Sequence, residues 1–211
     1  MRKIILVAFA ALMLMGVSVA TASAALPEFS AKTGFTGKSG TGTLTGPLTI
    51  KCSKDSVLNG TMPSLSHVEA DVHFEGCTIL GIPVNTTGDS SGVILLKVLI
   101  LFCYLTGSTK ASPKVGAFTE LKETVVIKGL GQESEVKGSV IGEAKPLNTS
   151  STKGEDLYKK TNPASCTSEN EGKGTTKKAE LLANLNGGKF EKAEEETTEE
   201  LTFEKAVELK A

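Results

Sequence analysis

One motif in this 211-residue chain matches the pattern of a catalytic serine. Gly88-Asp89-Ser90-Ser91-Gly92 fits the G-x-S-x-G signature of serine hydrolases, in which Ser90 would be the nucleophile. That signature requires a helix after the serine, whereas an apolar, β-like run follows Gly92. Neither His67 nor His73 stands in a protease motif that would supply a base. We therefore interpret the motif as a turn before a strand and predict no catalytic residue.

A second motif, His67–His73, has residue types that bind metals. In a strand, alternation places four of its side chains on one face: His67, Glu69, Asp71 and His73. A straight row does not bring three ligands together at one point, so a solvated strand face is the favoured interpretation. Whether this row binds a metal stays open, and we predict no metal site and no cofactor.

Acidic residues gather near the end of the chain, at Glu194–Glu196 and Glu199-Glu200. Their spacing lacks the alternating Asp and Gly pattern of a calcium-binding loop. We therefore expect a solvated acidic turn or edge at this point.

The elements that must position these residues are short β-segments separated by Gly, Thr, Ser and Asn. Residues 68–74 alternate apolar and polar, which predicts a strand with one buried face. Val93 to Leu105 is the most apolar run after the N-terminal segment and predicts a central strand. Segments 121–130 and 136–144 predict a hairpin around Gly129–Gln132.

The rest of the chain is less regular. Residues 146–177 are polar and predict a long loop or insertion. Segments 177–185, 190–193 and 201–209 resume the structured pattern, although 178–185 also fits a short helix. Together these patterns predict an all-β fold, an antiparallel sandwich or jelly-roll-like double sheet, in one domain over residues 25–211.

The N-terminus is typical of a secretory signal peptide. Basic Arg2 and Lys3 precede an apolar run over residues 4–17, and Ala22-Ser23-Ala24 fits a cleavage site, so residues 1–24 are predicted to be removed. Without Arg2 and Lys3 the formal net charge falls from -1 to -3, which argues against a nucleic-acid partner. We expect a secreted protein, extracellular or associated with the cell wall, with no membrane segment after cleavage.

All four cysteines follow the signal segment, and an even number in an exported chain favours disulfides. Cys52 and Cys77 each end a strand-like segment and are predicted to pair, which leaves Cys103 with Cys166 by elimination. No C-x-x-C or C-x-x-H spacing indicates a zinc site.

Three stretches carry a resemblance to a known family. They are Gly76-Cys77, Gly138-Ser139-Val140-Ile141-Gly142 followed by Pro146 and Asn148, and Asn186-Gly187-Gly188-Lys189-Phe190-Glu191-Lys192-Ala193. With the ending Glu204–Glu208, they resemble a family of secreted, β-rich proteins of soil actinobacteria. The resemblance implies an exported β-rich domain and no assigned activity.

Three classes of function follow from these observations. The favoured one is a non-catalytic binding or adhesive module at the cell envelope, with an extracellular or cell-wall ligand that the sequence does not identify. The alternative is a structural protein of the secretome or wall matrix, which exposed sheet edges would help to assemble. The third is a serine hydrolase that uses Ser90. No pattern fixes the oligomeric state.

Overall fold

The computed structural model describes residues 26–159 and 164–211 and is built almost entirely of β-strands. The predicted signal segment, residues 1–24, lies outside these residues. The first strands are β1 (Glu28–Phe29), β2 (Phe35–Ser39), β3 (Gly42–Thr45), β4 (Thr49–Cys52), β5 (Lys54–Thr61), β6 (His67–Glu75), β7 (Thr78–Ile79), β8 (Ile82–Pro83) and β9 (Asn85–Thr86). They are followed by β10 (Val93–Leu105), β11 (Val115–Leu121), β12 (Val125–Gly129), β13 (Gln132–Lys145), β14 (Ser151–Tyr158) and β15 (Ser165–Thr167). The 3-10 turn η1 (Asn170–Gly172), β16 (Thr176–Lys178), β17 (Leu181–Ala183), β18 (Glu191–Val207) and β19 (Leu209–Lys210) complete the described chain.

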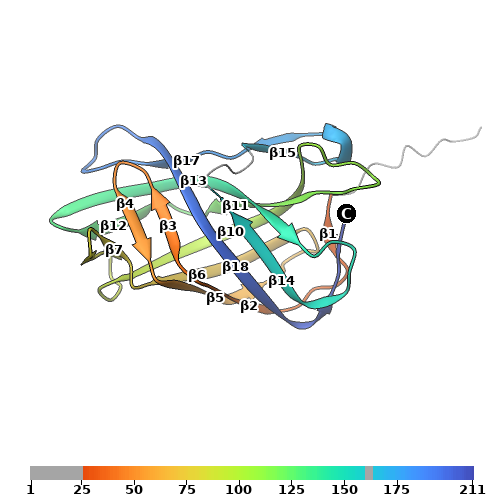
Figure 1. Cartoon of the computed structure of the whole chain (residues 1–211), viewed down its shortest axis with the longest axis horizontal. Helices are drawn as coiled ribbons and strands as arrows, with labels where there is room; N and C mark the ends of the chain where they lie inside the picture. The colour runs from red at the N-terminus through yellow and green to blue at the C-terminus, as the bar shows by residue number, and fades with distance from the viewer. Residues whose placement is uncertain (1–25, 160–163) are drawn as a thin grey trace, which may run out of the picture.

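Eight of these strands pair in a closed antiparallel ring, which forms a barrel (Figure 1). The order around the ring is β2, β5, β6, β10, β11, β13, β14, β18 and back to β2. The expected all-β, antiparallel, disulfide-linked fold is confirmed. Where a double sheet was predicted, the pairing of β18 with β2 joins the strands into one closed wall. An eight-stranded ring has an interior that side chains fill or that holds one small ligand.

Two small sheets extend this wall at one end of the barrel. The first half of β18 pairs with β17 and with the hairpin β3–β4, and β4 in turn pairs with β7. The first half of β13 pairs with β12 and β17, and β12 pairs with β9. The long strands β13 and β18 therefore belong both to the barrel and to its extension, at the left of Figure 1.

The opposite end of the barrel is closed by aromatic side chains. Phe29 contacts Phe102 and Phe203 with ring centroids 5.1 and 5.5 Å apart, and Phe35 lies 6.0 Å from Phe203. All four rings are buried. Phe29 is held there because β1 pairs with β19, so the two ends of the described chain meet over this cluster, which we call the aromatic plug.

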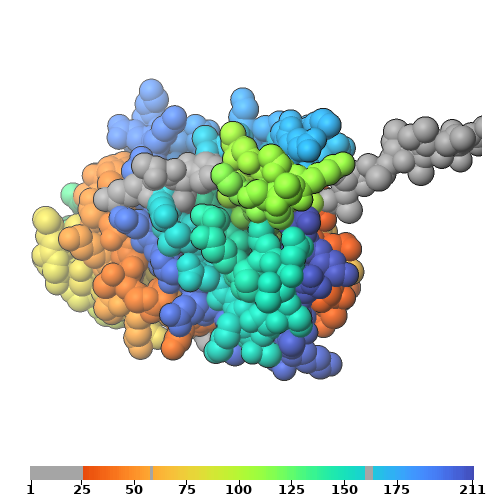
Figure 2. Space-filling view, turned by 45° about the vertical axis from the view of Figure 1, so that its right-hand side comes forward, coloured from red at the N-terminus to blue at the C-terminus, as the bar shows by residue number. Residues whose placement is uncertain are grey.

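Both predicted disulfides are present, Cys52–Cys77 and Cys103–Cys166. The first joins the end of β4 to the residue before β7 and fixes the wall extension to the barrel. The second links β10 to β15 and holds residues 164–178 against the outside of the barrel. In Figure 2 these residues, in light blue, lie beside the green loop that follows β10.

Segment 146–177, expected to be a polar loop or insertion, is a loop only in part. Ser151–Tyr158 forms β14, a full member of the barrel, because it pairs with β13 on one side and with β18 on the other. The strand has weak apolar character since its inward positions are Gly154, Asp156 and Tyr158. The prediction of a solvated turn or edge at Glu194–Glu196 and Glu199-Glu200 was also wrong, because these residues lie in the middle of β18.

Other expectations about single elements are confirmed. Val93–Leu105 is strand β10, and the predicted hairpin is formed by β12 and β13 around Leu130-Gly131. Segment 178–185 contains strand β17 and no helix. Within residues 26–159 and 164–211, no helix is long and apolar enough to cross a membrane.

Candidate functional site

The barrel contains a cavity of about 90 Å³ beside the aromatic plug. All eight barrel strands contribute to its wall, together with the hairpin β3–β4. Most of the wall is apolar: Val72, Leu96 and Leu121 are examples. Leu96 and Leu121 are only half-buried although they line the interior, because part of their surface faces the cavity. The cavity is therefore space that the side chains of the barrel leave unfilled.

One side of the cavity is acidic. Strand alternation along β18 turns Glu195 and Glu199 inward, and both line the cavity. Register places Asp156 of β14 directly opposite Glu199, and Ser39 of β2 opposite Glu199 on its other side. Since Lys38 pairs with Ser56, Asp55 of β5 comes next to Ser39. Four carboxyl groups from three strands thus face one region, and we call Asp55, Asp156, Glu195 and Glu199 the interior carboxyls.

These groups are buried without a basic partner among the described residues. Asp55 and Asp156 are each 3% exposed and Glu199 is 6% exposed. Glu195 keeps more accessible surface because it faces the cavity. Among the described residues that line the cavity, none is Lys, Arg or His. A buried carboxylate without a counter-charge is strongly destabilised relative to its neutral form.

The pKa values of the interior carboxyls are raised for this reason. Burial, with a smaller contribution from Glu155, raises the pKa of Asp156 to about 7. Burial followed by repulsion from Asp55 raises the pKa of Glu195 to about 7. The pKa of Glu199 lies well above its usual range, first because of burial and then because of the other three carboxyls.

Asp55 is the least satisfied of the four. Burial raises its pKa, and the nearby Ser39 and Glu199 side chains offset part of that rise. Neither of its carboxyl oxygens has a hydrogen-bond partner at good geometry among the described residues. The Thr197 hydroxyl, also buried on β18, is without a partner in the same part of the structure. The acidic wall therefore has hydrogen-bonding capacity that the protein does not use.

Tyr158 links the acidic wall to the apolar one. Its ring lines the cavity, and its hydroxyl lies 2.7 Å from the Thr119 hydroxyl across the barrel wall. Burial, followed by the charges of Asp156 and Glu199, raises the pKa of the phenol well above its usual value. Gly142 leaves room for the ring: a Cβ at that position would lie 2.9 Å from the nearest ring atom. The glycine thus sets the position of the tyrosine.

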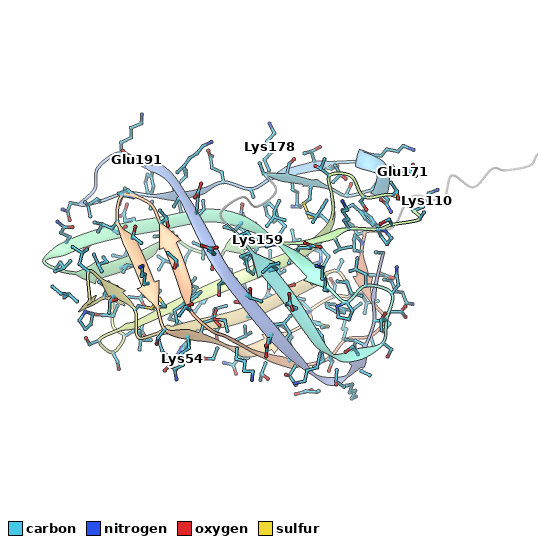
Figure 3. The ribbon with its side chains drawn as sticks, in the orientation of Figure 1. Lys54, Lys110, Lys159, Glu171, Lys178 and Glu191 are labelled. Atoms are coloured by element: carbon cyan, nitrogen blue, oxygen red, sulfur yellow. A yellow bond between two sulfur atoms is a disulfide. The ribbon has the colours of Figure 1, made fainter. Side chains whose placement is uncertain are left out.

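Basic residues near the interior carboxyls in sequence point away from them. Lys54, adjacent to Asp55, pairs with Glu75 at 2.8 Å. Figure 3 shows Lys54 on the outside of the barrel. Lys38, adjacent to Ser39, lies 3.8 Å from Glu200 with both side chains exposed. Alternation therefore separates the charges by face: ion pairs form outside, and carboxyls alone remain inside.

The structure does not assemble a serine hydrolase site at Ser90. This residue is exposed in the turn before β10, where its carbonyl accepts a hydrogen bond from the Val93 amide. The turn is held by a short hydrogen bond from the Thr86 hydroxyl to Asp89. No histidine hydrogen-bonds to Ser90 within the described residues.

The histidine row lies on the outer face of β6, as alternation predicts. Three of its members have separate partners: His67 bonds to Ser64 at 2.7 Å, Glu69 pairs with Lys122 at 2.7 Å, and Asp71 accepts from Asn59 at 3.4 Å. No group of three or more His, Cys, Asp or Glu side chains in the described parts of the chain is placed to hold a metal ion.

Comparison with known proteins adds no relative: no family model, no curated protein and no solved structure matches this chain. The interior carboxyls and the cavity therefore stand as the candidate site on their geometry alone. Sequence reasoning missed them because it placed the acidic residues in solvent. The usable signal was the two-residue spacing of Glu195, Thr197, Glu199, Leu201 and Phe203, in which polar residues continue the inward face of a strand.

Proposed function

We propose that the protein is an exported, non-catalytic binding protein that holds a small ligand inside its barrel. The observation that carries this proposal is the cavity, which combines an apolar wall with a few convergent polar groups. That combination is typical of small-molecule sites. An unfilled apolar cavity also destabilises a fold, so a ligand that fills it would add stability.

Export is supported by the signal-like segment at residues 1–24 and by the two disulfides, which form and persist in oxidising compartments. The ligand would then be an extracellular or cell-wall-derived small molecule. Binding inside the protein fits the structure better than assembly into a matrix, because each of the eight barrel strands has a neighbour on both sides and offers little free edge.

The size of the cavity limits the ligand. An apolar cavity of roughly 150 Å³ accepts benzene, so a cavity of about 90 Å³ suits a compact molecule with a short hydrocarbon part. A four-carbon chain is a suitable probe, and n-butanol provides it without a charge.

The test is titration of the chain lacking residues 1–24 with n-butanol, followed by methyl NMR. We expect saturable shifts of the Leu96 and Leu121 methyl signals, since both side chains line the cavity. Ala70→Leu adds three carbons to the cavity wall and should abolish the shifts. Ala111→Leu, the same substitution in an exposed loop, is the control and should leave them intact. Absence of saturable shifts in the unmodified protein would contradict the proposal.

A further inference from the structure

The charge distribution inside the barrel indicates what kind of ligand the cavity binds. The titratable groups that line the cavity are acidic or phenolic: Tyr158 on β14 and Glu195 and Glu199 on β18. Asp55 on β5 and Asp156 on β14 are buried next to Glu199 and raise its pKa. The neighbouring strands contribute hydroxyl groups, Ser39 on β2 and Thr119 on β11. No basic side chain of the described residues lines this space.

The acidic wall has hydrogen-bonding groups that the described residues leave unused. Among the described residues, the Thr197 hydroxyl is buried without a hydrogen-bond partner, and strand alternation places it on the inward face between Glu195 and Glu199. A carboxylate accepts hydrogen bonds and donates none, whereas an ammonium group donates three and accepts none. The partner of an ionised Glu195 is therefore a donor, and a positively charged one would also relieve the repulsion between Glu195 and its acidic neighbours.

The remaining wall excludes a bare ion as the natural occupant. Leu96 on β10 and Leu121 on β11 line the cavity from strands that carry no interior carboxyl, and they favour hydrocarbon. The described carboxyls are also not grouped closely enough to hold a metal ion. An occupant that satisfies both walls carries a cationic donor at one end and a short apolar body at the other.

We infer that the ligand is a small organic ammonium ion, with its nitrogen at Glu195 and Glu199 and its hydrocarbon part against Leu96 and Leu121. This inference rests on the proposed function, because it requires that the cavity bind a ligand at all. It assigns the charge of that ligand and the residues that select for it.

The affinity for an ammonium ion should depend on pH, and the direction of the change follows from the pKa values. Since the pKa values of Asp156 and Glu195 are about 7, these groups are neutral at pH 5 and ionised at pH 8. The amine stays protonated at both pH values. An ammonium ion should therefore bind more tightly at pH 8, where Glu195 in the cavity wall carries charge, than at pH 5.

The experiment compares three four-carbon probes at pH 8, n-butylamine, n-butanol and butyrate, by calorimetric titration. We expect n-butylamine to bind about tenfold or more tightly than n-butanol, which is the range of a hydrogen bond to a charged group, and butyrate not to bind. At pH 5 the advantage of n-butylamine over n-butanol should fall to about threefold or less.

Substitution locates the effect. Glu195→Gln should lower the affinity for n-butylamine about tenfold and leave the affinity for n-butanol unchanged, because only the charge is removed. Glu194→Gln is the matched control, since Glu194 is the exposed neighbour on the outer face. If the Glu195 variant does not give a native methyl spectrum, Glu199→Gln replaces it, because that side chain lines the cavity from the same strand.

The outcomes separate the two proposals. If n-butanol binds and n-butylamine binds no more tightly at pH 8, the ammonium inference is wrong while the proposed function stands. If butyrate is preferred, the inference is also wrong. If none of the three probes binds, the proposed function fails and the inference fails with it.

Discussion

The two ends of strand β18 differ in what they place inside the barrel. Toward the C-terminus, Phe203 points inward and belongs to the aromatic plug, where it contacts Phe29 and Phe35. Toward the N-terminus, Glu195 and Glu199 take equivalent inward positions and face a cavity. The backbone pattern is the same in both halves. Alternation therefore builds the wall, and the choice of inward residue decides whether a segment contributes stability or a binding site.

Removing the plug should have the largest effect on stability. Phe203→Ala deletes a buried ring that contacts Phe29 and Phe35, and it should lower the free energy of unfolding by about 3–5 kcal/mol. Phe190→Ala is the control, because that ring is half-buried on the surface beneath Lys137. Urea denaturation measures both. Equal decreases in the free energy of unfolding of the two variants would show that the aromatic plug contributes no more stability than a half-buried surface ring.

The interior carboxyls should make the protein less stable as pH rises. A buried carboxylate in an ion pair has the opposite effect, because it contributes more stability at higher pH. The folded-state pKa of Asp156, about 7, lies above its unfolded value of 3.8. Its stabilising contribution is therefore complete below the unfolded pKa and is lost as pH rises toward the folded pKa. Between pH 5 and pH 8 this group alone should lower the free energy of unfolding by about 2–3 kcal/mol.

Asp156→Asn tests that assignment, because it keeps the shape and removes the titration. We expect the variant to be the more stable protein at pH 8 and to show a smaller decrease between pH 5 and pH 8. Glu155→Gln, on the exposed neighbouring residue, should retain most of the decrease. Thermal melts at the two pH values provide the comparison, and an unchanged pH dependence in Asp156→Asn would refute the role of that residue.

Substitution of Gly142, which leaves room for the Tyr158 ring, should have an intermediate effect on the free energy of unfolding. Gly142→Ala places a methyl group within 3.0 Å of the tyrosine ring, and such overpacking destabilises by about 1–3 kcal/mol. Gly40→Ala is the matched control, since a Cβ there meets no atom within 4 Å. Chemical denaturation of both proteins measures the difference. If the Tyr158 ring moves freely into the cavity, the two variants should have the same free energy of unfolding, which would contradict the role of Gly142.

Substitution of the outward-facing charged residues should change the free energy of unfolding least. Glu200→Gln removes the partner of Lys38, but both side chains are largely exposed, so we expect a change below about 1 kcal/mol in the free energy of unfolding. Urea denaturation at pH 8 is the measurement. A loss as large as that of Phe203→Ala would contradict the separation of stabilising and surface residues along β18.

Sequence patterns predicted the parts of the fold in which inward residues are apolar. Val93–Leu105 was predicted with the same bounds as β10, and both disulfides were predicted, because apolar runs and cysteines report burial directly. β14 and the middle of β18 were not predicted as barrel strands. Their inward positions hold Asp156, Tyr158, Glu195 and Glu199, so the hydrophobic signal is absent where the candidate site lies. Ring closure was also beyond the sequence, since it depends on the pairing of β2 with β18.

The most direct test of the account is the position of a bound probe. Nuclear Overhauser contacts should be measured between n-butylamine and the methyl groups of the chain lacking residues 1–24, at pH 8. We predict contacts from the terminal methyl group of n-butylamine to Leu96 and Leu121, inside the barrel. Contacts confined to exposed side chains such as Leu80, which is 93% exposed, would contradict a binding site in the cavity.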